Sequence, residues 1–143
     1  MERVKINLPE IFNFKTEIAI RITDVNYGGH VGNDSLLSII QEARLQFFKQ
    51  YGYSEISIEG LGTIMADVSI EYKAEIFYGD VLEISVAIAG ISRVGFDLFY
   101  LIEKKNIDTT ILVAKAKTGI LCFDYTARKV VSMHVTAIEK FTK

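Results

Sequence analysis

One stretch of the chain, residues 33–51, has the pattern of a long amphipathic helix, and it constrains the fold more than any other feature. At about 100° per residue, its apolar side chains cover roughly half of the helix circumference. These side chains are Leu36, Leu37, Ile39, Ile40, Ala43, Phe47, Phe48 and Tyr51. So wide an apolar arc favours a helix enclosed by a sheet over one resting on a surface. Asn33 or Asp34 can cap its start, and Gly52 suits the position just past its end.

Alternation of apolar and polar residues predicts β-strands on both sides of this helix. One such stretch, from Thr16 to Asp24, precedes it, and a short one near 129–133 lies towards the end of the chain. Four long stretches lie between them: 63–73, 80–89, 94–104 and 110–123. Short turns with Gly, Asn or Asp join these stretches and suit antiparallel hairpins. The sequence therefore predicts one α+β domain over residues 1–143, an antiparallel sheet curled around one helix.

Composition excludes several classes of function. The net charge is −2 and no Lys/Arg cluster occurs, so a nucleic-acid partner is not expected. Cys122 is the single cysteine, which excludes an internal disulfide and a cysteine-based metal site. The chain starts without the apolar run of a signal peptide and has no stretch of membrane-spanning length. We expect a cytoplasmic protein without a membrane partner.

The junction between the first strand and the helix carries the strongest functional signal. It reads Asp24-Val-Asn26-Tyr-Gly28-Gly29-His30-Val-Gly-Asn33, and the helix follows at once. A glycine pair beside a helix N-terminus exposes backbone N–H groups and the positive end of the helix dipole. Such an arrangement stabilises an oxyanion or binds a phosphate. About two and a half turns into the helix, Glu42 offers a carboxylate that could act as a base.

These pieces, in this order, resemble the hotdog-fold thioesterases, most closely the branch of the 4-hydroxybenzoyl-CoA and long-chain acyl-CoA thioesterases. The resemblance runs from about residue 15 to residue 138. Besides the junction, it rests on Glu42-Ala43-Arg44, on Ile70-Glu-Tyr72-Lys73 and on Tyr78-Gly79-Asp80-Val81-Leu82. It implies a hotdog fold and hydrolysis of an acyl-CoA, or acyl-carrier-protein, thioester to acid and thiol. It further implies a homodimer or homotetramer that uses no cofactor apart from the coenzyme A of the substrate.

The chain departs from the family pattern at one catalytic position. The usual first motif is Asp-x-Asp, whose second Asp is the catalytic carboxylate, and here that position is Asn26. An amide cannot act as a general base or a carboxylate nucleophile. Other hotdog thioesterases carry their carboxylate on the helix, which assigns the role of base or nucleophile to Glu42. Asn26 would then hold the substrate carbonyl or the attacking water, and Asp67 would shape the pKa of Glu42 by like-charge repulsion.

The predicted substrate-binding residues are Gly28, Gly29, His30, Asn33 and Arg93. An N–H of Gly29 or His30 would form the oxyanion hole, and Arg93 would meet the phosphates of coenzyme A, as could Lys73 and Lys104. Each assignment has a structural alternative. Gly28 and Gly29 can simply form a tight turn, His30 can be a hydrogen-bond partner, and Glu42 or Asp67 can be a solvated surface charge.

Two other functions remain open. A non-catalytic acyl-CoA binder fits the amide at position 26, and an enoyl-CoA hydratase fits less well because His30 lies one residue too late for that signature. Arg44 points into the apolar arc of the helix, where an unpaired charge is costly. Asp24 is its predicted partner, in a structural ion pair.

Overall fold

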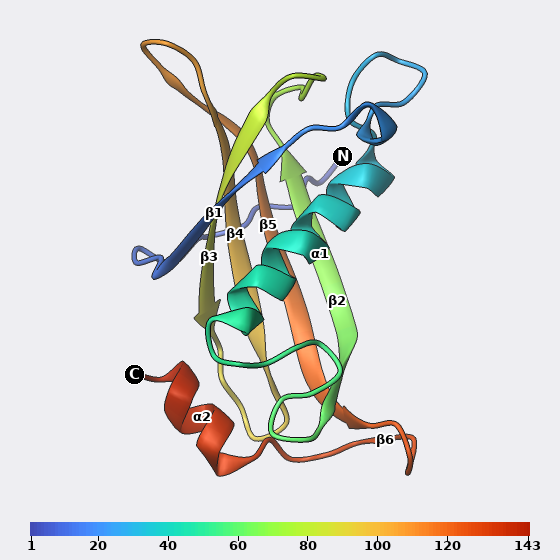
Figure 1. The fold of residues 1–143 in the computed structure, drawn as a ribbon, viewed down its shortest axis with the longest axis vertical. Coiled ribbons are helices and arrows are strands. Elements are labelled where there is room, and N and C mark those ends of the chain that lie inside the picture. The colour runs from blue at the N-terminus through green and yellow to red at the C-terminus, as the bar shows by residue number, and fades with distance from the viewer.

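Helix α1 (Asn33–Lys49) runs diagonally across one face of an antiparallel sheet (Figure 1). The computed structural model describes residues 1–143. The sheet has six strands in the order β1-β3-β4-β5-β2, with β6 paired to the end of β5. The strands are β1 (Phe14–Ala19), β2 (Gly62–Tyr72), β3 (Val81–Ala89), β4 (Gly95–Lys105), β5 (Thr110–Asp124) and β6 (Lys129–Val130). A 3₁₀ turn, η1 (Ile22–Asp24), and a second helix, α2 (Val135–Phe141), complete the chain.

The core lies between α1 and the face of the sheet that it covers. Alternate residues of β3 and β4 point at the helix and are fully buried, among them Leu82, Ile84, Leu98 and Tyr100. The helix contributes its apolar arc, and Phe48 is fully buried within it. Burying one such side chain stabilises the fold by about 1.5–3 kcal/mol. The predicted α+β architecture, a sheet curled around one long helix, is confirmed.

The first strand is shorter than its alternation predicts. The pattern extends to Asp24, but β1 ends at Ala19. The reason is local, because the Asp24 carboxylate accepts a hydrogen bond from the backbone N–H of Arg21 at 2.8 Å. This bond turns the chain into η1 and carries it towards the start of α1.

The C-terminal region also differs from the prediction, since strand β6 has two residues and α2 follows it. The helix begins where His134 accepts a hydrogen bond from the N–H of Thr136 through Nδ1, at 3.1 Å. Phe141 then fits among aromatic rings, with centroid distances of 5.1 Å to Tyr51 and 5.0 Å to Phe96. The sequence analysis missed α2 because seven residues are too few to display helical periodicity. Neither α1 nor α2 is long and apolar enough to cross a membrane.

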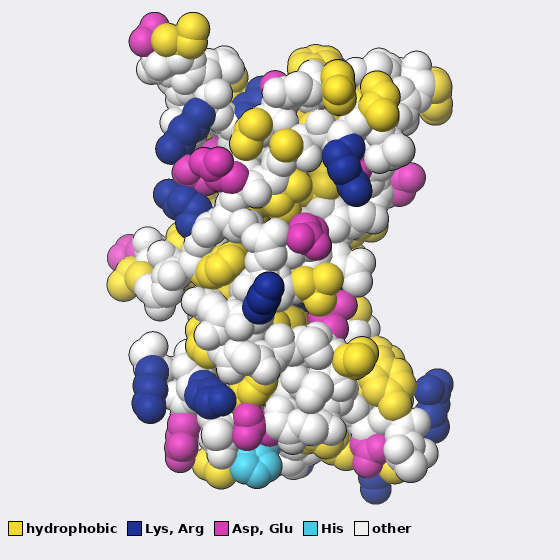
Figure 2. Space-filling view, viewed as in Figure 1, with side chains coloured by type: hydrophobic (Ala, Val, Ile, Leu, Met, Phe, Trp, Pro, Cys, Tyr) yellow, Lys and Arg dark blue, Asp and Glu magenta, His cyan; other side chains and the backbone are white.

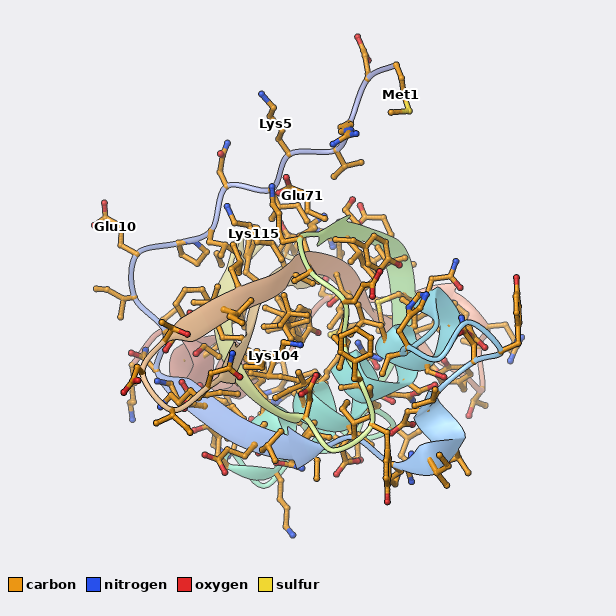
Figure 3. All side chains as sticks on the ribbon, turned by 90° about the horizontal axis from the view of Figure 1, so that it is seen from above. Met1, Lys5, Glu10, Glu71, Lys104 and Lys115 are labelled. Carbon is orange, nitrogen blue, oxygen red and sulfur yellow. The ribbon has the colours of Figure 1, made fainter.

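The N-terminal segment, residues 1–13, runs across the outside of the sheet and passes over Glu71 and Lys115 (Figure 3). Its anchor is Ile6, which is buried and donates its backbone N–H to a Glu71 carboxylate oxygen at 2.9 Å. That hydrogen bond lowers the pKa of Glu71. Ser85 and Ala87, which alternate with the inward residues of β3, are buried as well. This segment therefore covers part of the outer face of the sheet, while α1 covers the inner face.

Candidate active site

A cleft of about 920 Å³ opens at the N-terminus of α1. One wall is the segment that leads into the helix, including Asn26, His30, Asn33 and Asp34. The other wall is the end of β2 and the residues after it, from Tyr72 to Ile76. The topology brings these segments together, because the N–H of Val31 donates to the carbonyl of Ile76 at 2.8 Å. Three of the predicted site residues, Asn26, His30 and Asn33, therefore share one cleft.

Hydrophobic side chains gather at this end of the molecule (Figure 2). The exposed ones lie between β1 and α1 and from the end of β2 to the start of β3: Ile22, Tyr27, Tyr72, Phe77, Tyr78 and Val81. Tyr27 and Tyr72 line the cleft itself, from opposite walls. Lys73 lines it too, so the cleft combines an apolar rim with a positive charge.

The loop before α1 is a tight turn built around Asn26. The Asn26 N–H donates to the His30 carbonyl at 2.9 Å, and the Gly29 N–H donates to the Asn26 carbonyl at 3.1 Å. The side-chain Oδ1 of Asn26 accepts the N–H of Gly28 at 2.8 Å. Gly29 has φ +82°, a backbone conformation that favours glycine. Both glycine N–H groups are thus used within the turn, and the Nδ2 group of Asn26 is left pointing towards Gly32.

The N–H of His30, the other predicted donor, makes no hydrogen bond within the protein, and further free backbone donors lie in the first turn of α1. Its N-cap is Gly32, which has no side chain to cap the helix, and the first helical bond runs from the Leu36 N–H to the Gly32 carbonyl at 3.0 Å. The N–H groups of Asn33, Asp34 and Ser35 therefore make no hydrogen bond within the protein. These three donors lie at the positive end of the helix dipole, which favours a developing negative charge.

His30 lies between the turn and the helix and is half-buried. Its ring Nδ1 is 3.2 Å from the carbonyl oxygen of Val31. Since Nδ1 donates to that carbonyl, the other ring nitrogen is an acceptor in the neutral imidazole. An ideal Cβ added at Gly28 would lie 3.3 Å from this Nε2 atom, so the turn and the imidazole are in close contact.

Glu42 does not share this cleft. It lies on the β1 side of α1, in a separate groove of about 570 Å³ with Arg21 and Asp24. The side chain is exposed, and Oε1 accepts a hydrogen bond from Gln46 at 2.9 Å. Within one chain, the structure therefore separates the predicted base from Asn26 and His30.

Asp67 and Arg93 lie elsewhere. Asp67 follows a β-bulge in β2 and points to the outer face of the sheet, where it pairs with Lys117 at 2.8 Å and accepts the Gly119 N–H at 3.0 Å. The hydrogen bond from Lys117 lowers the pKa of Asp67. Because the sheet stands between them, Asp67 does not neighbour Glu42. Arg93 lies in the β3–β4 turn, at the end of the sheet opposite the cleft, and donates to the Ser132 hydroxyl at 2.7 Å.

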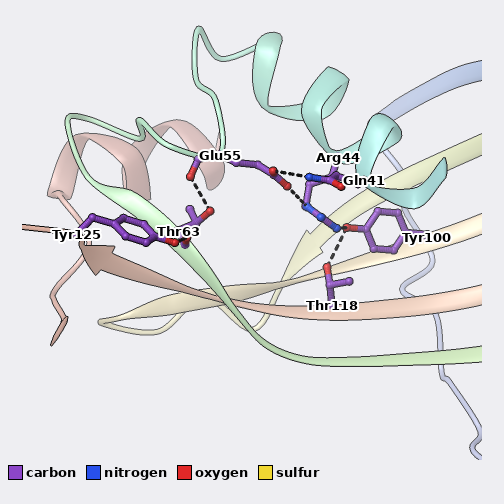
Figure 4. A network of polar contacts seen from close by, with 7 residues as sticks. All are labelled: Gln41, Arg44, Glu55, Thr63, Tyr100, Thr118 and Tyr125. Carbon is purple, nitrogen blue, oxygen red and sulfur yellow. Dashed lines mark hydrogen bonds and ion pairs between the residues drawn. The ribbon is translucent and has the colours of Figure 1, made fainter. Parts of the chain in front are cut away.

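The predicted Asp24–Arg44 ion pair is wrong. Arg44 is buried under α1, and its Nε donates to Glu55 at 2.6 Å (Figure 4). Asp24 pairs instead with Arg21 at 3.3 Å. Asp24 is drawn away because its carboxylate caps η1. Glu55 comes from the irregular segment between α1 and β2, where no periodic pattern marks a side chain as inward-facing.

Comparison with known proteins identifies the family. The sequence model of the "Thioesterase-like superfamily" matches residues 20–141. The chain belongs to this superfamily. A protein of Aquifex aeolicus (strain VF5), provisionally named an esterase, is 30% identical over 109 residues, which are 75% of this chain and 80% of that protein. The match to the superfamily model begins just before the Asn26 turn and includes both walls of the cleft.

Solved structures of thioesterases share the fold. A 1,4-dihydroxy-2-naphthoyl-CoA thioesterase from Synechocystis superposes with a TM-score of 0.77 at 24% identity, covering 91% of this chain and 98% of that one. A mutant 4-hydroxybenzoyl-CoA thioesterase complexed with 4-hydroxybenzoyl-CoA gives 0.79 at 19% identity, covering 88% and 96%. The resemblance to hotdog-fold thioesterases is therefore confirmed.

Sequence reasoning missed part of the cleft. The sequence predicts only a capping role for Asp34, although its place in the first turn beside the motif is a usable signal. It predicts no role for Gly32 and includes Tyr72 only as part of a family motif. Nothing in the sequence pairs residues 72–76 with the helix N-terminus, since that contact depends on how β2 lies in the sheet.

Proposed function

We propose that this thioesterase-like protein hydrolyses acyl-CoA thioesters in the cleft at the N-terminus of α1. The observation that carries the proposal is the set of three free N–H groups, from Asn33 to Ser35, beside the Asn26 amide and His30. A thioester carbonyl oxygen placed against these donors would be polarised, and its negative charge stabilised after attack. Loss of one such donor commonly costs about 3 kcal/mol of transition-state stabilisation.

The rest of the cleft suits a coenzyme A ester. Its apolar and aromatic rim can hold the acyl group, and Lys73 offers a positive charge for a phosphate. The structural relatives named above act on aromatic CoA esters, and one was crystallised with 4-hydroxybenzoyl-CoA. Lys73 pairs with Glu71 at 3.3 Å, but its side chain is 43% exposed. Lys104, paired with Asp80 at 2.9 Å, is only 12% exposed and is less suited to phosphate binding.

A second copy of the chain completes this proposal. Strand β2 forms one edge of the sheet, is 11 residues long, and exposes Ile64, Met65 and Val68. A long apolar edge strand is a template for pairing with another strand. Pairing of two β2 edges in a homodimer would place partner residues beside Tyr72, at the wall of the cleft.

The experiment is a thiol-release assay with a panel of aliphatic and aromatic acyl-CoAs. We expect release of coenzyme A from at least one class, by a species larger than the 16.1 kDa monomer in light scattering. A panel without release above the buffer rate would refute hydrolysis. If acyl-CoA then still raised the melting temperature, a non-catalytic binder would be favoured.

One substitution tests the helix donors. Asn33→Pro removes the first N–H of α1, and proline is well tolerated at this helical position. Gly32 already has φ −74° and ψ 161°, the extended conformation that a residue before proline requires. The control is Asn33→Ala, which keeps the N–H. We expect the kcat of Asn33→Pro to be about 100-fold lower than that of Asn33→Ala. Equal kcat in the two variants would remove this amide from the oxyanion hole.

The role of Glu42 stays a prediction, and Glu42→Gln tests it in the same assay. Because Glu42 lies in the separate groove beside β1, a catalytic role requires the reacting carbonyl to reach that groove, in the same chain or in a partner. Abolished turnover with an unchanged melting temperature would place Glu42 in the mechanism. Unchanged turnover would exclude it.

A further inference from the structure

We propose that Asp34 supplies the carboxylate that activates water in this cleft, in place of the acid that the family pattern puts at position 26. The inference rests on the proposed hydrolysis and names a catalytic residue for it. Asn26 cannot take a proton from water, so an active cleft needs a carboxylate from another position.

Asp34 is a carboxylate of the cleft that the fold leaves uncommitted. It lies in the first turn of α1, lines the cleft and is exposed. Its side chain makes no ion pair and no hydrogen bond within residues 1–143, whereas Asp67 is bound by Lys117 and Glu42 by Gln46. A free carboxylate at this position remains available to a water molecule and a substrate.

Gly32 leaves room for the side chains of Asp34 and Asn26 to approach each other. An ideal Cβ added at Gly32 would lie 2.6 Å from Oδ1 of Asp34 and 3.2 Å from Nδ2 of Asn26. Both side chains lie close to this one point, so the separation of Oδ1 and Nδ2 is at most the sum of the two distances. That limit is within reach of the roughly 5.6 Å spanned by one water molecule hydrogen-bonded to two partners.

The orientation of the Asn26 amide supports this pairing. Its Oδ1 accepts the N–H of Gly28, which leaves the Nδ2 group, a donor, on the side of Gly32. A water between the two residues accepts a hydrogen bond from Nδ2 and donates one to the Asp34 carboxylate. Its remaining lone pair is then available to attack a carbonyl carbon.

The step is balanced within the cleft. The Asp34 carboxylate takes a proton from the water as the water oxygen bonds to the thioester carbonyl carbon. The carbonyl oxygen becomes an oxyanion facing the free N–H groups of the first turn. Collapse of this intermediate breaks the carbon–sulfur bond, and the leaving thiolate receives the proton held by Asp34. The products are the free acid and the thiol, and Asp34 is again ionised.

The decisive comparison is Asp34→Asn against Glu139→Gln. Glu139 is an exposed carboxylate on α2 that lines neither the cleft nor the groove of Glu42. We expect Asp34→Asn to lower kcat at least 100-fold, the usual contribution of a general base. Glu139→Gln should stay within about threefold of wild type, and both variants should keep the wild-type melting curve.

A rescue variant keeps the test decisive if Asp34→Asn weakens the fold. Adding Asn26→Asp to Asp34→Asn restores a carboxylate on the other side of the same gap, and an Asp at position 26 can still accept the Gly28 N–H. We expect the kcat of this double variant to be at least tenfold higher than that of Asp34→Asn alone. If Asp34→Asn keeps more than half of the wild-type kcat, the proposal is overturned. A wild-type protein that releases no thiol from any acyl-CoA instead refutes the hydrolysis itself, so the two failures are distinct.

Discussion

Replacing Glu55 by alanine should destabilise the protein strongly, although Glu55 lies outside both grooves. The change leaves the Arg44 guanidinium, which is 7% exposed, with only a 3.4 Å contact to the Tyr100 hydroxyl. Burial by itself lowers the pKa of Arg44, but Tyr100 and Glu55 more than offset this effect. The net pKa lies above the ordinary arginine value, so the guanidinium stays charged. Breaking a buried ion pair from one side costs about 3–5 kcal/mol.

The lower end of that range applies here. The Glu55 side chain is 23% exposed, so water can partly replace the lost carboxylate, and we expect a loss of about 3 kcal/mol. At about 2–4 °C per kcal/mol, the melting temperature should fall by roughly 6–12 °C. Urea unfolding monitored by circular dichroism gives the free energy directly.

Arg44→Met in the Glu55→Ala background provides the control. Removing both charges leaves no unpaired ion, and a methionine fills part of the space of the arginine stem, so at least half of the loss should be recovered. Thiol release per folded molecule should stay unchanged, because Arg44 lines neither groove. A Glu55→Ala loss below about 1 kcal/mol, or no recovery in the double variant, would refute the reasoning.

Two further predictions concern stability. Burial raises the pKa of Tyr53 to about 12. A raised folded-state pKa means that its contribution to stability is present below pH about 10, the ordinary tyrosine value, and is lost as the pH rises towards 12. The Tyr53 hydroxyl has no hydrogen-bond partner, so Tyr53→Phe should cost nothing at neutral pH and should reduce the alkaline loss in melting scans from pH 8 to 12. Gly95→Ala would put a Cβ 2.1 Å from the backbone oxygen of Ile120, so β4 and β5 must separate locally. We expect a cost of about 3 kcal/mol in urea unfolding, and a loss under 0.5 kcal/mol would contradict the close approach of these strands.

The Asn26 turn shows how a sequence motif can be located correctly while its donors are misplaced. The glycine pair predicted free N–H groups, and the turn does lie at the helix N-terminus. Its own hydrogen bonds use the N–H groups of Gly28 and Gly29, however, so of the predicted donors only the His30 N–H is free. Further free donors are the N–H groups of Asn33, Asp34 and Ser35, in the first turn of α1. Which amides stay free depends on the path of the turn, and sequence spacing does not determine that path.

Periodicity by itself determined the architecture of this protein. The wide apolar arc of α1 and the alternation in β3, β4 and β5 are local patterns, each readable within one segment, and they leave a sheet around one helix as the way to bury both. Only the tertiary structure decided which charged groups meet. Arg44 pairs with Glu55 rather than with Asp24, Asp67 points outward after a bulge, Glu42 lies on the β1 side of α1, and the side chains of Asp34 and Asn26 both approach Gly32. Such pairings join residues from separate elements, so they depend on how those elements pack, and no single segment of the sequence carries that information.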